Sequence, residues 1–210
     1  MFGADFWQDL MLSLPAILIA ISFHEFAHGY VAYKLGDPTP KFQGRLTTNP
    51  VAHLDPIGTL MLIFAHFGWA KPVMVNPLNF RGDKKKGMLY VALAGPLTNM
   101  LIALIGAILY NLIRNLPIDI FFIIALDYLI QINIGFALFN LIPVPPLDGS
   151  KILAGILPYH MHDLIYQLEA YGPLILILII VSGVTDKTLW PIVNYLSGLF
   201  VNITGIFAIF

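Results

Sequence analysis

The stretch His24-Glu25-Phe26-Ala27-His28 lies within a mostly apolar run of residues that extends from Leu10 to Leu35. In a helix, residues four positions apart project from one face, so both histidine rings can reach a single metal ion. The glutamate beside the first histidine can then accept a proton from a water molecule that the metal activates. The run is about 37 Å long at 1.5 Å per residue, enough to cross the roughly 30 Å hydrocarbon core of a bilayer. The sequence therefore predicts a metal-binding helix that spans a membrane.

The composition indicates a membrane protein. Hydrophobic residues make up 58% of the chain and charged residues 11%, and the mean hydropathy is +0.81. Soluble domains carry about 25% charged residues, so we expect a polytopic membrane protein. The net charge of −1 gives no indication of nucleic-acid binding, and the absence of cysteine excludes disulfides and thiolate metal ligands.

The order of apolar segments predicts an all-α polytopic membrane protein with five to six transmembrane helices in a single domain, residues 1–210. The expected helices are three core helices at about 10–35, 87–113 and 120–142 and two C-terminal helices at about 164–183 and 188–207. Residues 41–80 are expected to form a short re-entrant or β region between the first two core helices. Its apolar run 56–68 is too short for a full crossing, and residues 72–77 form an extended piece bounded by prolines.

The positive charges give an orientation for these helices. Eight of the eleven Lys and Arg residues lie between positions 34 and 86. The positive-inside rule places this whole stretch on the cytoplasmic side, which requires residues 56–68 to enter the membrane and return. We therefore expect a multi-pass protein of the cell membrane, surrounded by the lipid bilayer.

A catalytic zinc ion needs three protein ligands and an open fourth position, so a third ligand must join His24 and His28. The best candidate is Asp148, which follows three prolines between positions 143 and 146 and precedes Gly149. The prolines cannot continue a helix, so the chain can turn back toward the protein interior. From the bare sequence, a cap for a short helix at 150–157 is an equally good interpretation of Asp148.

Three motifs occur together in the order and spacing of a known family. They are the H-E-x-x-H helix, Ala94-Gly95-Pro96-Leu97-Thr98-Asn99, and the segment with Asn140, Pro143 and Leu147-Asp148-Gly149. In this combination, which covers roughly residues 20–150, the chain resembles the site-2 protease family of intramembrane zinc metalloproteases. The form it resembles is the compact bacterial and archaeal one, without an inserted PDZ-like domain or C-terminal CBS domains.

The resemblance implies that His24, His28 and Asp148 bind one Zn²⁺ per chain and that Glu25 is the catalytic base. It implies a zinc-dependent endopeptidase whose partners are membrane-spanning protein substrates, with no nucleic acid involved and the oligomeric state left open. It also implies a core of three helices that holds the site.

Three further polar residues are candidates for contact with the substrate or an oxyanion. The resemblance implies that Asn99 and Asn140, on the other two core helices, act near the substrate. Asn99 could instead join helices through side-chain hydrogen bonds. His53 could orient substrate or an oxyanion at the membrane surface, or serve a structural role.

Two other functions are alternatives to the endopeptidase. A membrane metal-ion transporter would have ligands spread along a pathway and no need for a glutamate base. A catalytically inactive scaffold that binds membrane helices would need neither the complete ligand set nor Glu25. The concentration of these residues in the motifs favours the endopeptidase.

Overall fold

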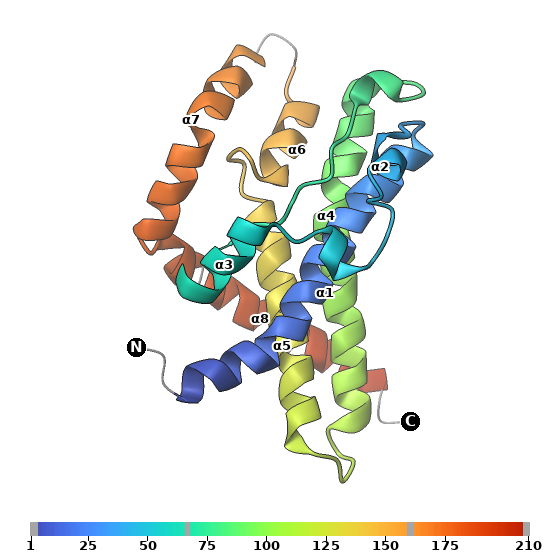
Figure 1. The fold of residues 1–210 in the computed structure, drawn as a ribbon. Coiled ribbons are helices and arrows are strands. Elements are labelled where there is room, and N and C mark those ends of the chain that lie inside the picture. Colours follow the sequence, from blue (N-terminus) through green and yellow to red (C-terminus); the bar gives the residue numbers. More distant parts are fainter. Residues whose placement is uncertain (1–3, 66–67, 159–161, 208–210) are drawn as a thin grey trace.

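The computed structural model describes residues 4–65, 68–158 and 162–207, and the regular structure of these ranges is helical, without a strand (Figure 1). The helices are α1 (Ala4–Lys34), α2 (Thr39–Phe42), η1 (Pro50–Ala52), α3 (Pro56–Ala65), η2 (Pro77–Asn79), α4 (Lys84–Ile113), α5 (Ile120–Asn140), α6 (Asp148–Ile156), α7 (His162–Val181) and α8 (Val184–Phe207). The expected core helices and C-terminal helices are all present, with α1 beginning earlier than expected.

Four helices in the described ranges are long and apolar enough to cross a membrane. They are Asp9–Lys34 of α1, Lys84–Ile113, Ile120–Asn140 and Val184–Ile206 of α8. The apolar part of α7, Leu168–Val181, is shorter. The helical membrane class is confirmed, whereas the count of five to six spans stays a prediction.

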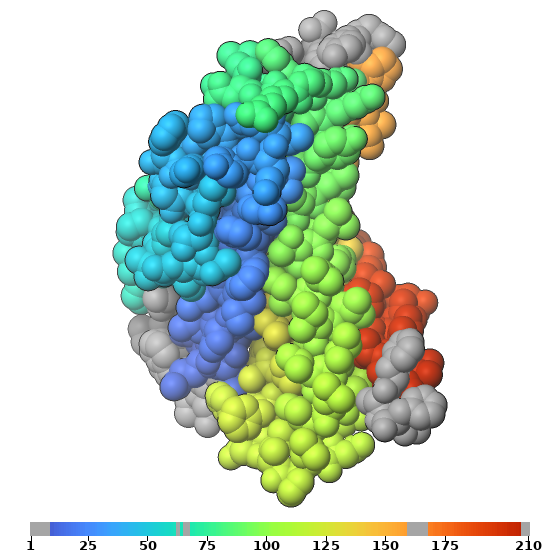
Figure 2. Space-filling view, turned by 90° about the vertical axis from the view of Figure 1, so that its right-hand side faces the viewer, coloured from blue at the N-terminus to red at the C-terminus, as the bar shows by residue number. Residues whose placement is uncertain are grey.

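Helices α1, α4 and α5 pack against one another, and α8 packs against α4 and α5. Figure 2 shows α4 (green) flanked by α1 (blue) and α8 (red). Ala103 and Ala107 of α4 lie against Ile130 and Ile134 of α5, and all four are fully buried. Because lipid is as apolar as these side chains, close packing of small residues and interhelical hydrogen bonds hold such helices together.

The end of α1 and the start of α4 lie at the same end of the bundle. The N–H of Arg81 donates a hydrogen bond of 2.8 Å to the C=O of Leu35. Phe80 packs with Ala32 of α1 and Val91 of α4. The connector, defined as residues 35–83, therefore leaves the bundle and returns to it at one end.

The connector differs from the expected β element. α3 holds ten residues, within the described part of the apolar run 56–68. Residues 72–77 have no strand partner in the described chain, and an isolated antiparallel bridge between Leu54 and Ala70 precedes them. A β-strand needs a neighbour to complete its hydrogen bonds, and a lone extended segment has none.

Asp37 fastens the connector to the end of α1. Its buried carboxylate accepts hydrogen bonds from the amide and hydroxyl of Thr39, from the amide of Asn76 at 2.7 Å and from the side chain of Asn79 at 2.8 Å. Burial acts to raise the pKa of this carboxyl, but the hydrogen bonds outweigh it and hold the pKa below its ordinary value. The ionised carboxylate therefore fixes residues 76–79 beside α1.

Candidate metal centre and active site

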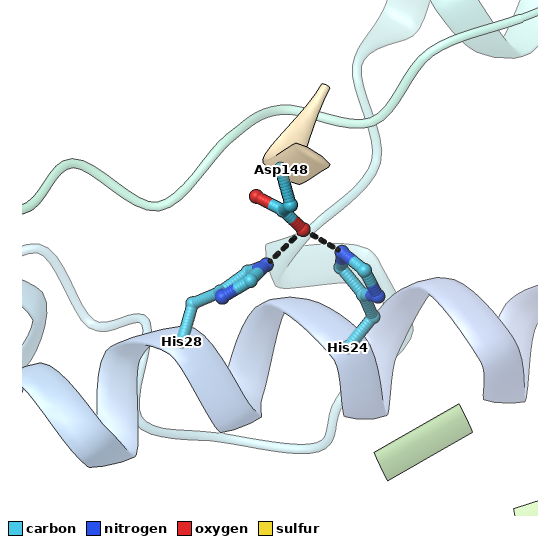
Figure 3. A group of neighbouring side chains, drawn as sticks. All are labelled: His24, His28 and Asp148. Atoms are coloured by element: carbon cyan, nitrogen blue, oxygen red, sulfur yellow. Dashed lines mark hydrogen bonds and ion pairs between the residues drawn. The ribbon is translucent and has the colours of Figure 1, made fainter. Parts of the chain in front are cut away.

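His24, His28 and Asp148 converge on one point, with both rings directed at the same carboxylate oxygen (Figure 3). Oδ2 of Asp148 is 3.0 Å from Nε2 of His24 and 2.9 Å from Nε2 of His28. The two rings meet at 88° with their centroids 4.5 Å apart. All three side chains are buried, and one ligand atom from each lies within 4.8 Å of the others.

Asp148 reaches the histidines because the chain turns sharply after α5. The N-cap of α6 is Leu147, and Asp148 is the first residue of the helix, so the interpretation of Asp148 as its cap is not observed. Gly149 permits the close turn, since a Cβ there would lie 2.3 Å from the carbonyl oxygen of Leu141. The proline-broken return of the chain thus delivers the carboxylate to α1.

The two oxygens of Asp148 have different partners. Oδ2 faces the histidines, and Oδ1 lies 3.4 Å from Nζ of Lys151, one turn along α6. Burial acts to raise the pKa of this carboxyl, but the hydrogen bonds and charges of His24 and His28 hold the pKa well below its usual range. Oδ2 of Asp148 is therefore the oxygen placed to share a cation with the two histidines.

The second nitrogen of each histidine fixes the rotation of its ring. Nδ1 of His28 donates a hydrogen bond of 2.7 Å to the C=O of Val91, and Nδ1 of His24 lies 2.7 Å from Oδ1 of Asn99. Because both partners are oxygen acceptors, Nδ1 of each ring carries a proton. A metal ion at the shared point would therefore be bound through the Nε2 lone pairs, with the remaining proton of each ring held on Nδ1.

Gly95 of α4 leaves room for both rings. A Cβ at this position would lie 2.5 Å from Cε1 of His24 and 2.6 Å from Nε2 of His28. A side chain of any size would therefore displace the histidines from their shared point. The sequence motif contains this glycine, but the contact that requires it becomes evident only in the structure.

Glu25 follows His24 on α1 and is half-buried. Its Oε2 accepts a hydrogen bond of 2.9 Å from the backbone N–H of Val73. The connector thus passes beside the motif and holds the candidate base in one orientation.

Asn140 and His53 have partners elsewhere. Nδ2 of Asn140 donates to the C=O of Phe136 at 2.9 Å. His53 is fully buried, its Nε2 donates to the C=O of Thr47 at 2.8 Å, and its Nδ1 has no partner in the described part of the chain. No contact of either residue with the ligand group is recorded in the described ranges, so their roles toward substrate stay predictions.

The sequence interpretation missed two groups that support the site. Asn133 of α5 accepts a hydrogen bond from Asn99, and the amide of Val73 binds Glu25. Asn133 carries a signal that could have been used, because it lies two helical turns before Asn140 on a mostly apolar helix. Val73 carries none, since its contribution comes from the backbone.

The donor set fits Zn²⁺. Two imidazole Nε2 atoms and one carboxylate oxygen can supply the three protein ligands of a catalytic zinc site, which leaves a fourth position open. A second carboxylate, Glu25, stands beside the set with its own hydrogen bond and can serve as a base. A buried centre of this kind among membrane-length helices defines an intramembrane metalloprotease.

Comparison with known proteins gives the family. The sequence model of peptidase family M50 matches residues 116–182 of this chain. YwhC of Bacillus subtilis (strain 168), which is named as a zinc metalloprotease, is 40% identical over 184 residues that cover 85% of this chain and 84% of that protein. The chain belongs to peptidase family M50, the site-2 protease family.

Two further relatives are also named as zinc metalloproteases. Rip2 of Mycolicibacterium smegmatis is 25% identical over 190 residues, which cover 88% of this chain and 72% of that protein. MJ0392 of Methanocaldococcus jannaschii is 30% identical over 159 residues, which cover 75% of this chain and 37% of that protein. No solved structure matches the chain significantly. Family membership confirms the predictions of a zinc cofactor and a metalloprotease activity.

Proposed function

We propose that this chain is a single-domain, multi-pass endopeptidase of the cell membrane that hydrolyses peptide bonds of membrane-spanning proteins with one Zn²⁺. The observation that carries the proposal is the convergence of His24, His28 and Asp148 beside Glu25, within helices apolar enough to cross a membrane. These residues supply a ligand set and a base at one buried place.

The roles of the residues follow from their contacts. A bound Zn²⁺ supplies a Lewis acid that polarises the scissile carbonyl and lowers the pKa of water. Glu25 accepts the proton of the attacking water and returns it to the leaving amine. The amide of Val73 holds that carboxylate during both transfers, while Asn99 and the carbonyl of Val91 keep the two rings turned toward the shared point.

A cavity of about 420 Å³ is separated from His24 by the ring of Phe136 and suits an apolar substrate segment. Its mainly apolar walls come from α1, α3, α5, α7 and α8. Phe136 lines this cavity and also stands edge-on to the ring of His24, with the centroids 5.0 Å apart. A substrate side chain in the cavity would therefore lie next to the reacting carbonyl. We propose Asn140, four residues after Phe136 on the same face of α5, as a polar contact for that segment.

Residues 71–74 of the connector offer an edge for strand addition. The amide of Lys71 is bound to the C=O of His53 and that of Val73 to Glu25, so these two amides face the protein. Neighbouring residues of an extended chain direct their backbone groups to the opposite edge. The N–H of Met74, a 61% exposed residue, has no partner in the described chain. An unwound substrate can complete its own hydrogen bonds there, with His53 keeping the connector in place.

The test uses the full chain in detergent, with zinc content and cleavage of a membrane-spanning substrate measured together. Glu25→Gln should keep zinc and lose cleavage by about 10²–10⁴-fold, because glutamine cannot accept the proton. Glu169→Gln, at the exposed second glutamate of the chain, is the matched control and should cut normally. Asp148→Ala should lose zinc. Cleavage by Glu25→Gln at the wild-type rate would overturn the proposed mechanism.

A further inference from the structure

Asn133 is a fully buried polar residue in the middle of α5, with the apolar core residues Ile130 and Ile134 beside it. Its Oδ1 accepts a hydrogen bond from Nδ2 of Asn99 at 2.8 Å, and its Nδ2 donates to the C=O of Leu129 at 2.8 Å. A polar side chain at such a place is costly unless its hydrogen bonds are complete. The direction of each of these bonds can be assigned.

Two backbone carbonyls set that direction. The C=O of Leu129 can only accept, so Asn133 must turn its NH₂ group toward Leu129 and its oxygen toward Asn99. The C=O of Ala20 accepts from the same Nδ2 of Asn99 at 3.0 Å, so the oxygen of Asn99 must point the other way. That oxygen lies 2.7 Å from Nδ1 of His24.

We infer that Asn133 is a positioning residue for the metal ligand His24 and that it acts through the amide of Asn99. Because Asn99 presents an oxygen, the proton of His24 is on Nδ1, and Nε2 presents its lone pair to a metal ion. A flipped Asn99 would turn its NH₂ group toward Nδ1. The favoured tautomer would then carry its proton on Nε2, where it blocks metal binding. The inference rests on the proposed function, in which His24 binds Zn²⁺.

Asn111 of α4 provides a matched comparison, because it is a buried asparagine that joins helices of the same bundle. Its Nδ2 donates to the C=O of Val201 at 2.7 Å and to Oγ1 of Thr204 at 2.8 Å, both on α8. Its Oδ1 has no partner in the described ranges, so no hydrogen bond leads from it toward the metal ligands. If Asn133 only joined helices, loss of either asparagine would affect zinc binding alike. The positioning role makes zinc affinity sensitive to Asn133 alone.

The experiment measures the zinc affinity of the purified full chain by competition with a chelator of known affinity. Asn133→Leu removes the acceptor for Asn99 and should weaken zinc binding about 10–100-fold, the usual cost of losing an outer partner of a ligand. Asn111→Leu should leave the affinity unchanged. Asn133→Asp, as the neutral acid, keeps an oxygen acceptor toward Asn99 and an O–H donor toward the C=O of Leu129, so it should restore an affinity close to that of the wild type.

Co²⁺ in place of Zn²⁺ adds a second readout, because its visible absorption depends on ligand number and geometry. Asn133→Leu should lose the absorption of the three-ligand site at Co²⁺ concentrations that saturate the wild type. Wild-type zinc affinity in Asn133→Leu overturns the inference. If that variant does not fold, Asn133→Ala adds no bulk, and unchanged affinity there is equally decisive. A wild type that binds no zinc would contradict the proposed function instead.

Discussion

The backbone N–H of Val73 donates a hydrogen bond of 2.9 Å to Oε2 of Glu25, which lies 48 residues earlier in the chain. Two hydrogen bonds within the connector hold the segment on either side of Val73. The amide of Lys71 donates to the C=O of His53, and the amide of Asn76 donates to the carboxylate of Asp37. The segment proposed to receive the substrate therefore also orients the base proposed to act on it. A change in this segment should affect binding and chemistry separately, according to which amide it removes.

Val73→Pro removes the amide that holds Glu25 and should lower kcat roughly 10–100-fold, because a hydrogen bond to a charged group contributes about 1.5–3 kcal/mol. Zinc content and KM should change little, since neither the ligands nor the free edge is altered. Val73→Ala, which keeps the N–H, is the control and should cut at nearly the wild-type rate. Equal kcat for the proline and alanine variants would show that this amide does not position the base.

Met74→Pro removes the free amide of the proposed edge and should raise KM while kcat and zinc content stay near their wild-type values. The physical reason is that the substrate backbone loses one donor but Glu25 keeps its own. Met74→Ala separates the backbone effect from loss of the side chain. Steady-state cleavage kinetics of a membrane-spanning substrate provide the measurement, and an unchanged KM in the proline variant would exclude strand addition at this residue.

The sequence alone predicts the parts of the site that depend on helical periodicity and on residues that end a helix. The spacing of His24 and His28 on one helix face follows from helical periodicity, and the prolines before Asp148 indicate the return of the chain. The partners of these side chains depend on packing between distant segments. Asn99 meets His24 across 75 positions of sequence, and no local pattern specifies that pair.

The connector shows the opposite case, where a local pattern did not determine the structure. The β-prone residues between Pro72 and Pro77 predict an extended piece, but a strand also requires a neighbour. The described chain supplies single anchors to this piece instead of a second strand, namely a carbonyl at His53 and carboxylates at Glu25 and Asp37. Substrate would be the missing neighbour under the proposed function.

Gly95→Ala should weaken zinc binding, because the added methyl would lie 2.5 Å from the ring of His24. Overpacking of this kind costs about 1–3 kcal/mol, which corresponds to roughly 10–100-fold in zinc affinity if the rings bear the strain. Gly198→Ala in α8 is the control, since its methyl would meet no atom within 4 Å and should be neutral or slightly stabilising. Chelator competition measures both, and wild-type zinc affinity in Gly95→Ala would contradict the described ring positions.

Asp37 should make the stability of the chain sensitive to acid. Its pKa is lower in the folded protein than in the unfolded chain, so its stabilisation is complete above the unfolded value of about 3.9 and is lost as the pH falls through the folded value. Asp37→Asn should therefore be less stable than wild type by about 1–3 kcal/mol at pH 7, and the difference should shrink below about pH 4. Thermal unfolding with a chelator present, which removes the separate effect of zinc loss, provides the measurement. A difference that is constant with pH would exclude this carboxylate as its source.

The last prediction concerns the side of the membrane on which the connector begins and ends. The hydrogen bond of 2.8 Å between Arg81 and Leu35 brings the end of α1 and the start of α4 together, so a full crossing by residues 56–68 would have to be matched by another within the connector. The wild-type chain contains no cysteine. Lys41→Cys and Lys84→Cys should therefore both react with an impermeant thiol reagent only when the cytoplasmic face is open. Arg114→Cys, at the other end of α4, should react only from the opposite face and shows that the membrane is sealed. Reaction of Lys41→Cys and Lys84→Cys from opposite faces would make residues 56–68 a true span and would exclude the re-entrant arrangement.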